Sequence, residues 1–370
     1  MTKELAEFSV VYTERALNHM TDKFGQVMRD LSSILTQAYH AHQAIVLPGS
    51  GTYAMEAVAR QFLNPSSSSL IIRNGWFSYR WSQIIEQGRL GKSSTVLSAV
   101  ANSDEKYATY SPAPLQQVID AINAEKPEVV FAPHVDTSAG IRLQDYYTRT
   151  IAETVHKNGG LFALDCIASG ADWLNMQALG IDILISAPQK GWSAPAGAGF
   201  VMLSEAAANK LAISKSSSFA MNLKQWQSIM QAYLAGRHAY HATMPTDTLL
   251  QCRDNMQECY RYGLDKLAKA QLKLGEEIRL LLIEKDFPSV AGKGWKSSAV
   301  IVSYTDDENI HNGRTFKEHG MQIAAGVPLA CGEREDFSTF RIGLFGIDKL
   351  FDIDMTIARF KAILDAIKPI

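Results

Sequence analysis

Hydrophobic positions along the first two hundred residues follow two alternating periods. Apolar residues spaced by threes and fours predict helices at residues 21–43, 53–62, 74–81, 115–123 and 145–156. Short continuous apolar runs predict buried strands at residues 44–47, 69–73, 127–133, 161–165, 181–185 and 200–203. Strands that alternate with helices of this length form βαβ units, so we expect an α/β fold with a mostly parallel sheet.

The last third of the chain has a different pattern. A long helical stretch at 248–283 precedes predicted strands at 296–304 and 339–345 and a closing helix at 355–367. We therefore expect a smaller α+β domain here. The predicted limits are residues 1–20 for an N-terminal segment that joins the small domain, 21–250 for the large domain and 251–370 for the small domain.

Composition narrows the classes of protein. A net charge of −2 over 370 residues gives no reason to expect binding to nucleic acid or to a membrane surface. The four cysteines form no C-x-x-C pair, and the nine histidines form no H-x-x-x-H pair, so no metal site is expected. The first residues hold no apolar signal core, and no apolar run is long enough to span a membrane, so we expect a cytoplasmic protein.

Lys190 is the most informative single residue. It lies between the strands predicted at 181–185 and 200–203, among Gly, Ala, Pro and Ser. Desolvation disfavours the charged form of an amine, and a neutral lysine can attack a carbonyl to form a Schiff base. A lone lysine of this kind is more often a solvated loop residue, so the interpretation depends on its companions.

Those companions follow other predicted strands. In a parallel sheet, ligands collect at the carboxyl ends of the strands. The G-S-G-T turn at 49–52 lies between a strand and a helix, which is typical of a phosphate site, although Thr52 is also a plausible helix cap. Asp165 ends an apolar strand, where it is either a cap or a counter-ion. The polar residues expected at this edge are Ser50, Thr52, Thr137, Asp165, Gln189 and Lys190.

Seven segments together resemble the fold-type I, class V aminotransferases, particularly the alanine–glyoxylate and serine–glyoxylate branch. These segments are G-S-G-T-Y-A-M-E (49–56), N-G-W-F-S-Y-R (74–80), H-V-D-T-S-A-G-I (134–141), L-D-C-I-A-S (164–169), S-A-P-Q-K (186–190), Y-H-A-T (240–243) and F-R-I-G-L-F-G (340–346). The resemblance implies a seven-stranded sheet flanked by helices in the large domain. It also implies that this domain binds pyridoxal 5'-phosphate (PLP), which acts as an electron sink whose ring nitrogen is kept protonated by an acid.

The resemblance also implies a role for each site residue. Lys190 would form the Schiff base with the cofactor and move the substrate proton, and Asp165 would pair with the ring nitrogen. Phe77 and Ile167 would pack on the two faces of the ring, and Thr137 would lie beside the ring hydroxyl. The phosphate would be held by Ser50, Gly51, Thr52 and Gln189.

Three further residues concern partners and substrates. In the family, the pair that matches Tyr240 and Thr243 reaches the phosphate of the neighbouring subunit, which implies a homodimer with shared active sites. Arg341 would bind the substrate carboxylate, for which a planar bidentate donor is suited. The leading hypothesis is therefore a transaminase that moves an amino group from a small amino acid, such as alanine or serine, to a small 2-oxo acid, such as glyoxylate or pyruvate.

Two alternatives remain open. Cys331 lies ten positions before Arg341 in a loop-like stretch, which is compatible with a PLP-dependent lyase such as a cysteine desulfurase. A cofactor-binding module without catalysis is the other. The chain also departs from its relatives near the N-terminus, where residues 7–19 lack the Pro-Gly-Pro turn that lines the substrate entrance, so the amino donor is left open.

Overall fold

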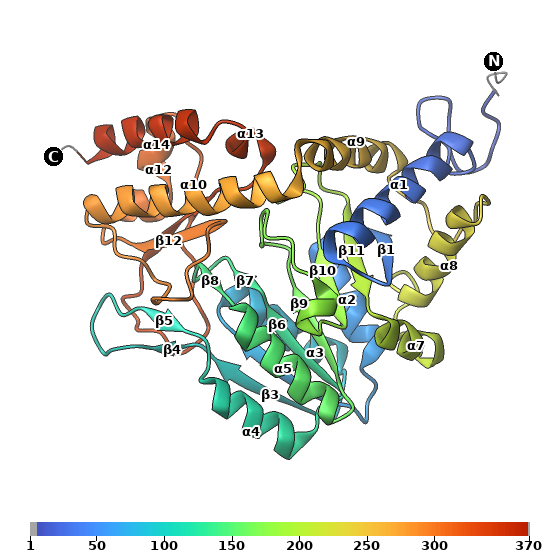
Figure 1. Cartoon of the computed structure of the whole chain (residues 1–370), viewed down its shortest axis with the longest axis horizontal. Coiled ribbons are helices and arrows are strands. Elements are labelled where there is room, and N and C mark those ends of the chain that lie inside the picture. The colour runs from blue at the N-terminus through green and yellow to red at the C-terminus, as the bar shows by residue number, and fades with distance from the viewer. Residues whose placement is uncertain (1–5, 369–370) are drawn as a thin grey trace.

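A seven-stranded sheet forms the centre of the larger part of the molecule (Figure 1). The computed structural model describes residues 6–368. Only β11 runs antiparallel to its neighbours, β1 and β10, and the remaining pairs are parallel. In sheet order the strands are β1 (Gln43–Pro48), β11 (Ala198–Leu203), β10 (Ile183–Ser186), β9 (Leu161–Asp165), β6 (Val129–Pro133), β2 (Ser68–Arg73) and β3 (Ser93–Ser98). The predicted α/β fold with a mostly parallel seven-stranded sheet is confirmed.

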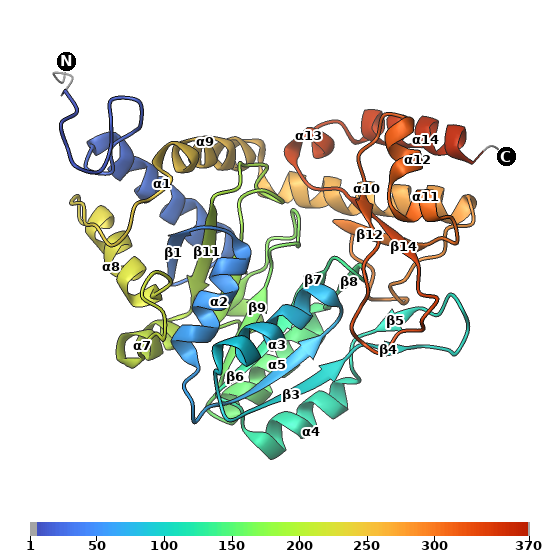
Figure 2. The same cartoon turned by 180° about the vertical axis from the view of Figure 1, so that it is seen from behind.

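Helices cover both faces of this sheet (Figures 1 and 2). One face is covered by α4 (Leu115–Glu125) and α5 (Asp145–Lys157), and the other by α2 (Gly51–Phe62) and α3 (Trp76–Gly88). At the β1 edge, α1 (Asp22–Tyr39) and α8 (Leu223–Leu234) pack on β1 and on each other, and α7 (Glu205–Ile213) lies beside α8. The central strands are buried along their whole length, as expected for parallel strands covered on both faces.

The C-terminal part contains a three-stranded antiparallel sheet in the order β12-β14-β13. The strands are β12 (Val300–Tyr304), β14 (Thr339–Gly343) and β13 (Ala324–Ala325), and the helices are α10 (Leu264–Glu284), α11 (Glu308–His311), α12 (Arg314–Glu318), α13 (Ile347–Leu350) and α14 (Ile353–Ile367). The single helix expected over 248–283 is two helices, because α9 (Thr246–Tyr262) ends at Gly263. That glycine has a φ of 108°, which disfavours any residue with a side chain.

Short elements connect the two parts. The hairpin of β7 (Val135–Asp136) and β8 (Ile141–Arg142) extends toward the C-terminal part, where Ile141 forms a bridge with Lys296. The smaller elements β4 (Val100–Ala101), β5 (Tyr110–Ser111) and α6 (Met176–Leu179) complete the fold. Within residues 6–368, no helix has both the length and the apolar character needed to cross a membrane.

The described part of the N-terminal segment packs beside α8 and the start of α9. The Tyr12 hydroxyl donates to the Met244 carbonyl at 3.0 Å, and the Leu17 N–H donates to Asp247 at 3.2 Å. The Tyr233 hydroxyl, on α8, donates to the His19 carbonyl at 3.0 Å. The domain limits at residues 20 and 250, and the assignment of residues 1–20 to the small domain, stay predictions.

Candidate functional site

Five loops meet at the carboxyl edge of the parallel strands. They follow β1, β2, β6, β9 and β10, and they carry the predicted site residues Ser50, Gly51, Thr52, Phe77, Thr137, Asp165, Ile167, Gln189 and Lys190. Because these strands run in the same direction, segments far apart in the sequence are brought to one edge. The sequence predicted this convergence from the polar residues at the strand ends.

Lys190 lies in a compact turn after β10. The turn is closed by hydrogen bonds from the Ser193 N–H to the Lys190 carbonyl and from the Ala194 N–H to the Pro188 carbonyl, both 3.0 Å long. The Lys190 amine lies 5.1 Å from the centroid of the Phe345 ring and forms no ion pair among the described residues. Burial lowers the pKa of Lys190 below its usual value, although the carboxylate of Asp165 opposes this shift.

Asp165 is the acid of the site. It ends β9 and is almost fully buried, and its Oδ1 accepts a hydrogen bond of 2.9 Å from the Ile167 N–H. Burial raises the pKa of Asp165 to about 6, despite the opposing effects of that hydrogen bond and of the Lys190 charge. A buried carboxyl group with one hydrogen bond is therefore ready to receive a cationic partner.

The N-terminus of α2 faces the same region. Ser50 is its N-cap residue, but the Ser50 side chain makes no capping hydrogen bond, and the first turn carries no acidic residue. A Cβ at Gly51 would meet the Cδ1 atom of Ile167, so the glycine lets α2 and the loop after β9 approach closely. Free N–H groups and a free hydroxyl at a helix N-terminus favour an anion.

Phe77 stands at the start of α3 with two arginines beside its ring. The guanidinium carbons of Arg80 and Arg341 lie 4.8 and 5.4 Å from the ring centroid. Arg341 comes from β14 of the C-terminal part, where its Nε donates to the Ala325 carbonyl at 2.7 Å. The site is therefore built by both parts of the chain.

Asp136, which is not among the site residues predicted from the sequence, fixes this arrangement. It is fully buried, and its two oxygens accept hydrogen bonds from the N–H and hydroxyl groups of Ser78 and Ser138, at 2.6 to 3.0 Å. Ser78 follows Phe77 on α3, and Ser138 follows Thr137. The carboxylate therefore joins the loops after β2 and β6. The position of Asp136 within the H-V-D-T-S segment could have indicated a role in the site. The short β7–β8 hairpin that orients its side chain could not be predicted from the sequence.

Thr137 and Gln189 lie at the sheet edge, whereas Tyr240 and Thr243 lie between α8 and α9. The hydroxyl of Thr137 is buried and has no hydrogen-bond partner among the described residues. Gln189 is exposed at the same edge. Tyr240 and Thr243 bond to each other at 3.1 Å in the segment between α8 and α9, where the Tyr240 ring lies 5.6 Å from that of His19. Within residues 6–368, no hydrogen bond or ion pair joins Tyr240 or Thr243 to Lys190 or Asp165.

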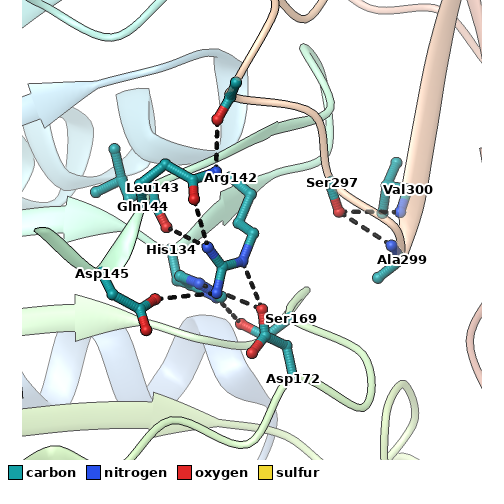
Figure 3. Close-up of polar contacts among 11 residues, drawn as sticks. His134, Arg142, Leu143, Gln144, Asp145, Ser169, Asp172, Ser297, Ala299 and Val300 are labelled. Atoms are coloured by element: carbon teal, nitrogen blue, oxygen red, sulfur yellow. Dashed lines mark hydrogen bonds and ion pairs between the residues drawn. The ribbon is translucent and has the colours of Figure 1, made fainter. Parts of the chain in front are cut away.

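A second polar cluster, in which His134 and Ser169 are buried, lies beside the site (Figure 3). His134 Nδ1 is 2.7 Å from the Ser169 hydroxyl, and Arg142 Nε donates to Asp172 at 2.6 Å. Arg142 also donates through its other two nitrogens, and its backbone N–H donates to the Trp295 carbonyl at 2.7 Å. This cluster ties the loop after β9 to the C-terminal part of the chain.

Comparison with known proteins agrees with the geometry. The chain is 27% identical over 352 residues to alanine–glyoxylate aminotransferase of Oryctolagus cuniculus, covering 89% of this chain and 82% of that protein. The solved ureidoglycine–glyoxylate aminotransferase of Bacillus subtilis superposes with a TM-score of 0.79 at 19% identity, covering 94% of this chain and 87% of that one. An alanine–glyoxylate aminotransferase from Nostoc sp. superposes with a TM-score of 0.78 at 21% identity, covering 94% and 89%.

These two structures share the fold of this chain, which confirms the predicted fold-type I architecture. The model of the family described as aminotransferase class-V matches residues 2–348, nearly the whole chain. The predicted family is thereby confirmed as well: the chain belongs to the class-V aminotransferases.

Proposed function

We propose that this chain is a PLP-dependent aminotransferase that moves the amino group of a small amino acid, such as alanine or serine, to glyoxylate or pyruvate. The observation that carries the proposal is one half-buried amine, Lys190, held at the sheet edge near a buried acid, Asp165, with the ring of Phe77 and the carboxylate-binding group of Arg341 in the same site. The names of the relatives support the choice of glyoxylate as the acceptor.

The chain's own groups fit PLP. The Thr137 hydroxyl is a buried polar atom without a partner, as expected of a group that completes its hydrogen bonding with a ligand. Ser50, Gly51 and Thr52 at the N-terminus of α2 would hold the phosphate, together with Gln189. Asp165 would lie by the ring nitrogen, and Phe77 and Ile167 would contact the ring faces.

Each of these residues then has a chemical task. Bound PLP supplies an electron sink that makes the α-proton of an amino acid removable. Lys190 would accept that proton on its amine and return it, for which a lowered pKa is an advantage. Asp165 would keep the ring nitrogen protonated, and Arg341 would orient the substrate through its carboxylate.

The homodimer also belongs to this proposal. Tyr240 is 56% exposed and Thr243 is also exposed, and within residues 6–368 neither hydroxyl forms a hydrogen bond with Lys190. This position supports a role in the site of a second copy, at the phosphate end. A cytoplasmic location stays a prediction.

The desulfurase alternative loses support at Cys331. Burial raises the pKa of the Cys331 thiol to about 12, whereas a nucleophilic cysteine must ionise near neutral pH. Its Sγ lies 3.5 Å from the Arg73 carbonyl, and its loop is closed by Glu333, which accepts the N–H groups of Leu329, Ala330 and Cys331. A protonated thiol in a pinned loop is a structural group.

The decisive experiment replaces Lys190 with alanine. We expect Lys190→Ala to abolish turnover and to leave no borohydride-reducible bond between protein and cofactor, whereas the exposed-lysine control Lys215→Ala keeps both. The measurements are amino transfer to glyoxylate and the mass of the protein after borohydride treatment. Wild-type turnover in Lys190→Ala would refute the proposal, and a reducible bond in the wild type without turnover of any donor would favour the cofactor-binding module.

A further inference from the structure

We infer that Arg80 is an additional ligand of the PLP phosphate, and that it carries the positive charge that neutralises this group. The inference rests on the proposed function, because it assigns a residue to the cofactor of that function. Arg80 lies one helical turn after Phe77 on α3, which places it on the same face of the helix.

The geometry directs Arg80 to the phosphate end of the site. Its Nη1 donates to the Thr52 hydroxyl at 3.1 Å, and Thr52 belongs to the first turn of α2, where the free N–H groups lie. Its guanidinium carbon also lies 4.8 Å from the centroid of Phe77. A cation held over an aromatic face and by one hydroxyl has a fixed position before any ligand arrives.

Arg80 has unused donors. A guanidinium group carries five N–H donors, and the one hydrogen bond from the Arg80 side chain among the described residues is that to Thr52. None of the ion pairs within residues 6–368 includes Arg80, although it is only half-exposed. By contrast, Arg60 at the far end of α2 is paired with Glu56 at 2.6 Å. A partly buried, unpaired guanidinium group favours an anionic partner such as a phosphate.

The distribution of charge in the site also supports this role of Arg80. The N-terminus of α2 and the hydroxyls of Ser50 and Thr52 are neutral donors, and the first turn of α2 contains no basic side chain. Arg341 is held at the other part of the chain by the Ala325 carbonyl, and Lys190 has the covalent role. Arg80 is therefore the cation that is bonded to the phosphate end, which separates its task from the carboxylate binding of Arg341.

The test compares two forms of the vitamin that differ only in the phosphate. Apoenzymes of the wild type, Arg80→Met, Arg80→Lys and the control Arg60→Met are titrated with PLP and with pyridoxal, and binding is followed by the absorbance of the bound cofactor. We expect Arg80→Met to bind PLP about 10- to 100-fold more weakly than the wild type and to bind pyridoxal equally well. Arg80→Lys, which keeps the charge but loses the fork, should show a smaller loss for PLP alone, and Arg60→Met should bind both cofactors like the wild type.

The outcomes separate this inference from the proposed function. An equal loss for PLP and pyridoxal would overturn the inference, because Arg80 would then act through Phe77 or the fold; unchanged binding of PLP would overturn it too. If Arg80→Met does not fold, the same comparison on Arg80→Lys decides. Wild-type protein that binds PLP without a borohydride-reducible bond would refute the proposed function, whereas a normal bond in the wild type with full PLP affinity in Arg80→Met would refute only the role of Arg80.

Discussion

The functional site and the polar cluster beside it differ in how their arginine side chains are hydrogen-bonded. Beside the site, all three guanidinium nitrogens of Arg142 donate, to Asp172, Leu143, Gln144 and Asp145 (Figure 3). In the site, the Arg341 side chain donates through Nε alone to any residue that the structure describes. Both residues contribute to contacts between the two parts of the chain, but the Arg142 side chain makes four hydrogen bonds and that of Arg341 makes one among residues 6–368.

This difference distinguishes a side chain that stabilises the fold from one that has free donors for a ligand. A buried donor without a partner costs free energy in the empty protein, so it persists where a ligand satisfies it. Asp165 shows the same contrast among the acids. It accepts one hydrogen bond, whereas the neighbouring Asp136 accepts four. The number of hydrogen bonds, more than burial, distinguishes Arg142 and Asp136 from Arg341 and Asp165.

The largest expected effect concerns Asp165. Asp165→Asn should lower the rate of amino transfer about 10²- to 10³-fold, since asparagine cannot carry the charge that keeps the ring nitrogen protonated. The same substitution should raise the stability of the apoenzyme at a pH where Asp165 is ionised. Because the folded pKa of about 6 lies above the unfolded value, the folded state binds more protons at Asp165 between about pH 4 and 6, and the contribution of Asp165 to wild-type stability falls as the pH rises through that window.

At pH 8 the Asp165→Asn apoenzyme should therefore be more stable than the wild type, on the order of 1–3 kcal/mol, by urea unfolding. Saturating PLP should reverse the order, because the cofactor compensates the buried charge only in the wild type. Asp136→Asn is the matched control, since it removes charge from the saturated carboxylate and should destabilise the apoenzyme. A less stable Asp165→Asn apoenzyme would place Asp165 with the structural group.

The same contrast explains how far the sequence could lead. The parallel sheet and its edge residues followed from apolar runs and from polar groups such as Asp165 and Lys190 at the strand ends. The sequence could not show saturation, which depends on partners far along the chain. Asp136 meets Ser78 across 58 positions, and Arg80 meets Thr52 across 28. Neither pair is implied by any local pattern, although Arg80 lies within the N-G-W-F-S-Y-R segment, which resembles the aminotransferase family.

Other misses have local causes. The strand Ser93–Ser98 is rich in serine and partly exposed at the sheet edge, so it lacks the apolar run that marked the other strands. Helix α7 has its apolar residues spread around the axis, with only Ala207 and Leu211 buried, and shows no clear helical stripe. The break at Gly263 was hidden because the apolar spacing continues on both sides of it.

The two arginines provide a direct test of intermediate size. Arg341→Lys keeps the charge but loses the bidentate fork, so the KM for the amino donor should rise about 10- to 100-fold while the free energy of unfolding stays the same. Arg142→Lys should do the reverse, losing on the order of 2 kcal/mol of stability with an unchanged KM in the folded enzyme. Steady-state kinetics and urea unfolding of both variants decide it. A stability loss in Arg341→Lys equal to that in Arg142→Lys would end the distinction.

The smallest expected effect is a pH dependence at His134, in the cluster that contains Arg142. Burial lowers the pKa of His134 to about 4, so the folded state keeps the ring neutral while the unfolded chain binds a proton below about pH 6.5. The unfolded state then holds more protons, and this contribution to stability is lost as the pH falls from about 6.5 to 4. The sign is opposite to that of Asp165 in the apoenzyme, and both windows include pH 5.

His134→Gln in the Asp165→Asn background isolates the effect. Between pH 7 and 5 the Asp165→Asn apoenzyme should lose about 1–2 kcal/mol more stability than the double variant, which has no histidine to protonate at this position. The comparison is made by urea unfolding at both pH values. The same carboxylates titrate in both proteins, so their contributions cancel in the difference between the two. Parallel pH profiles would mean that His134 takes up its proton over the same pH range in the folded protein as in the unfolded chain, so that it is charged at pH 5. His134 and Asp172, whose nearest charged atoms are 3.7 Å apart, would then form an ion pair at pH 5.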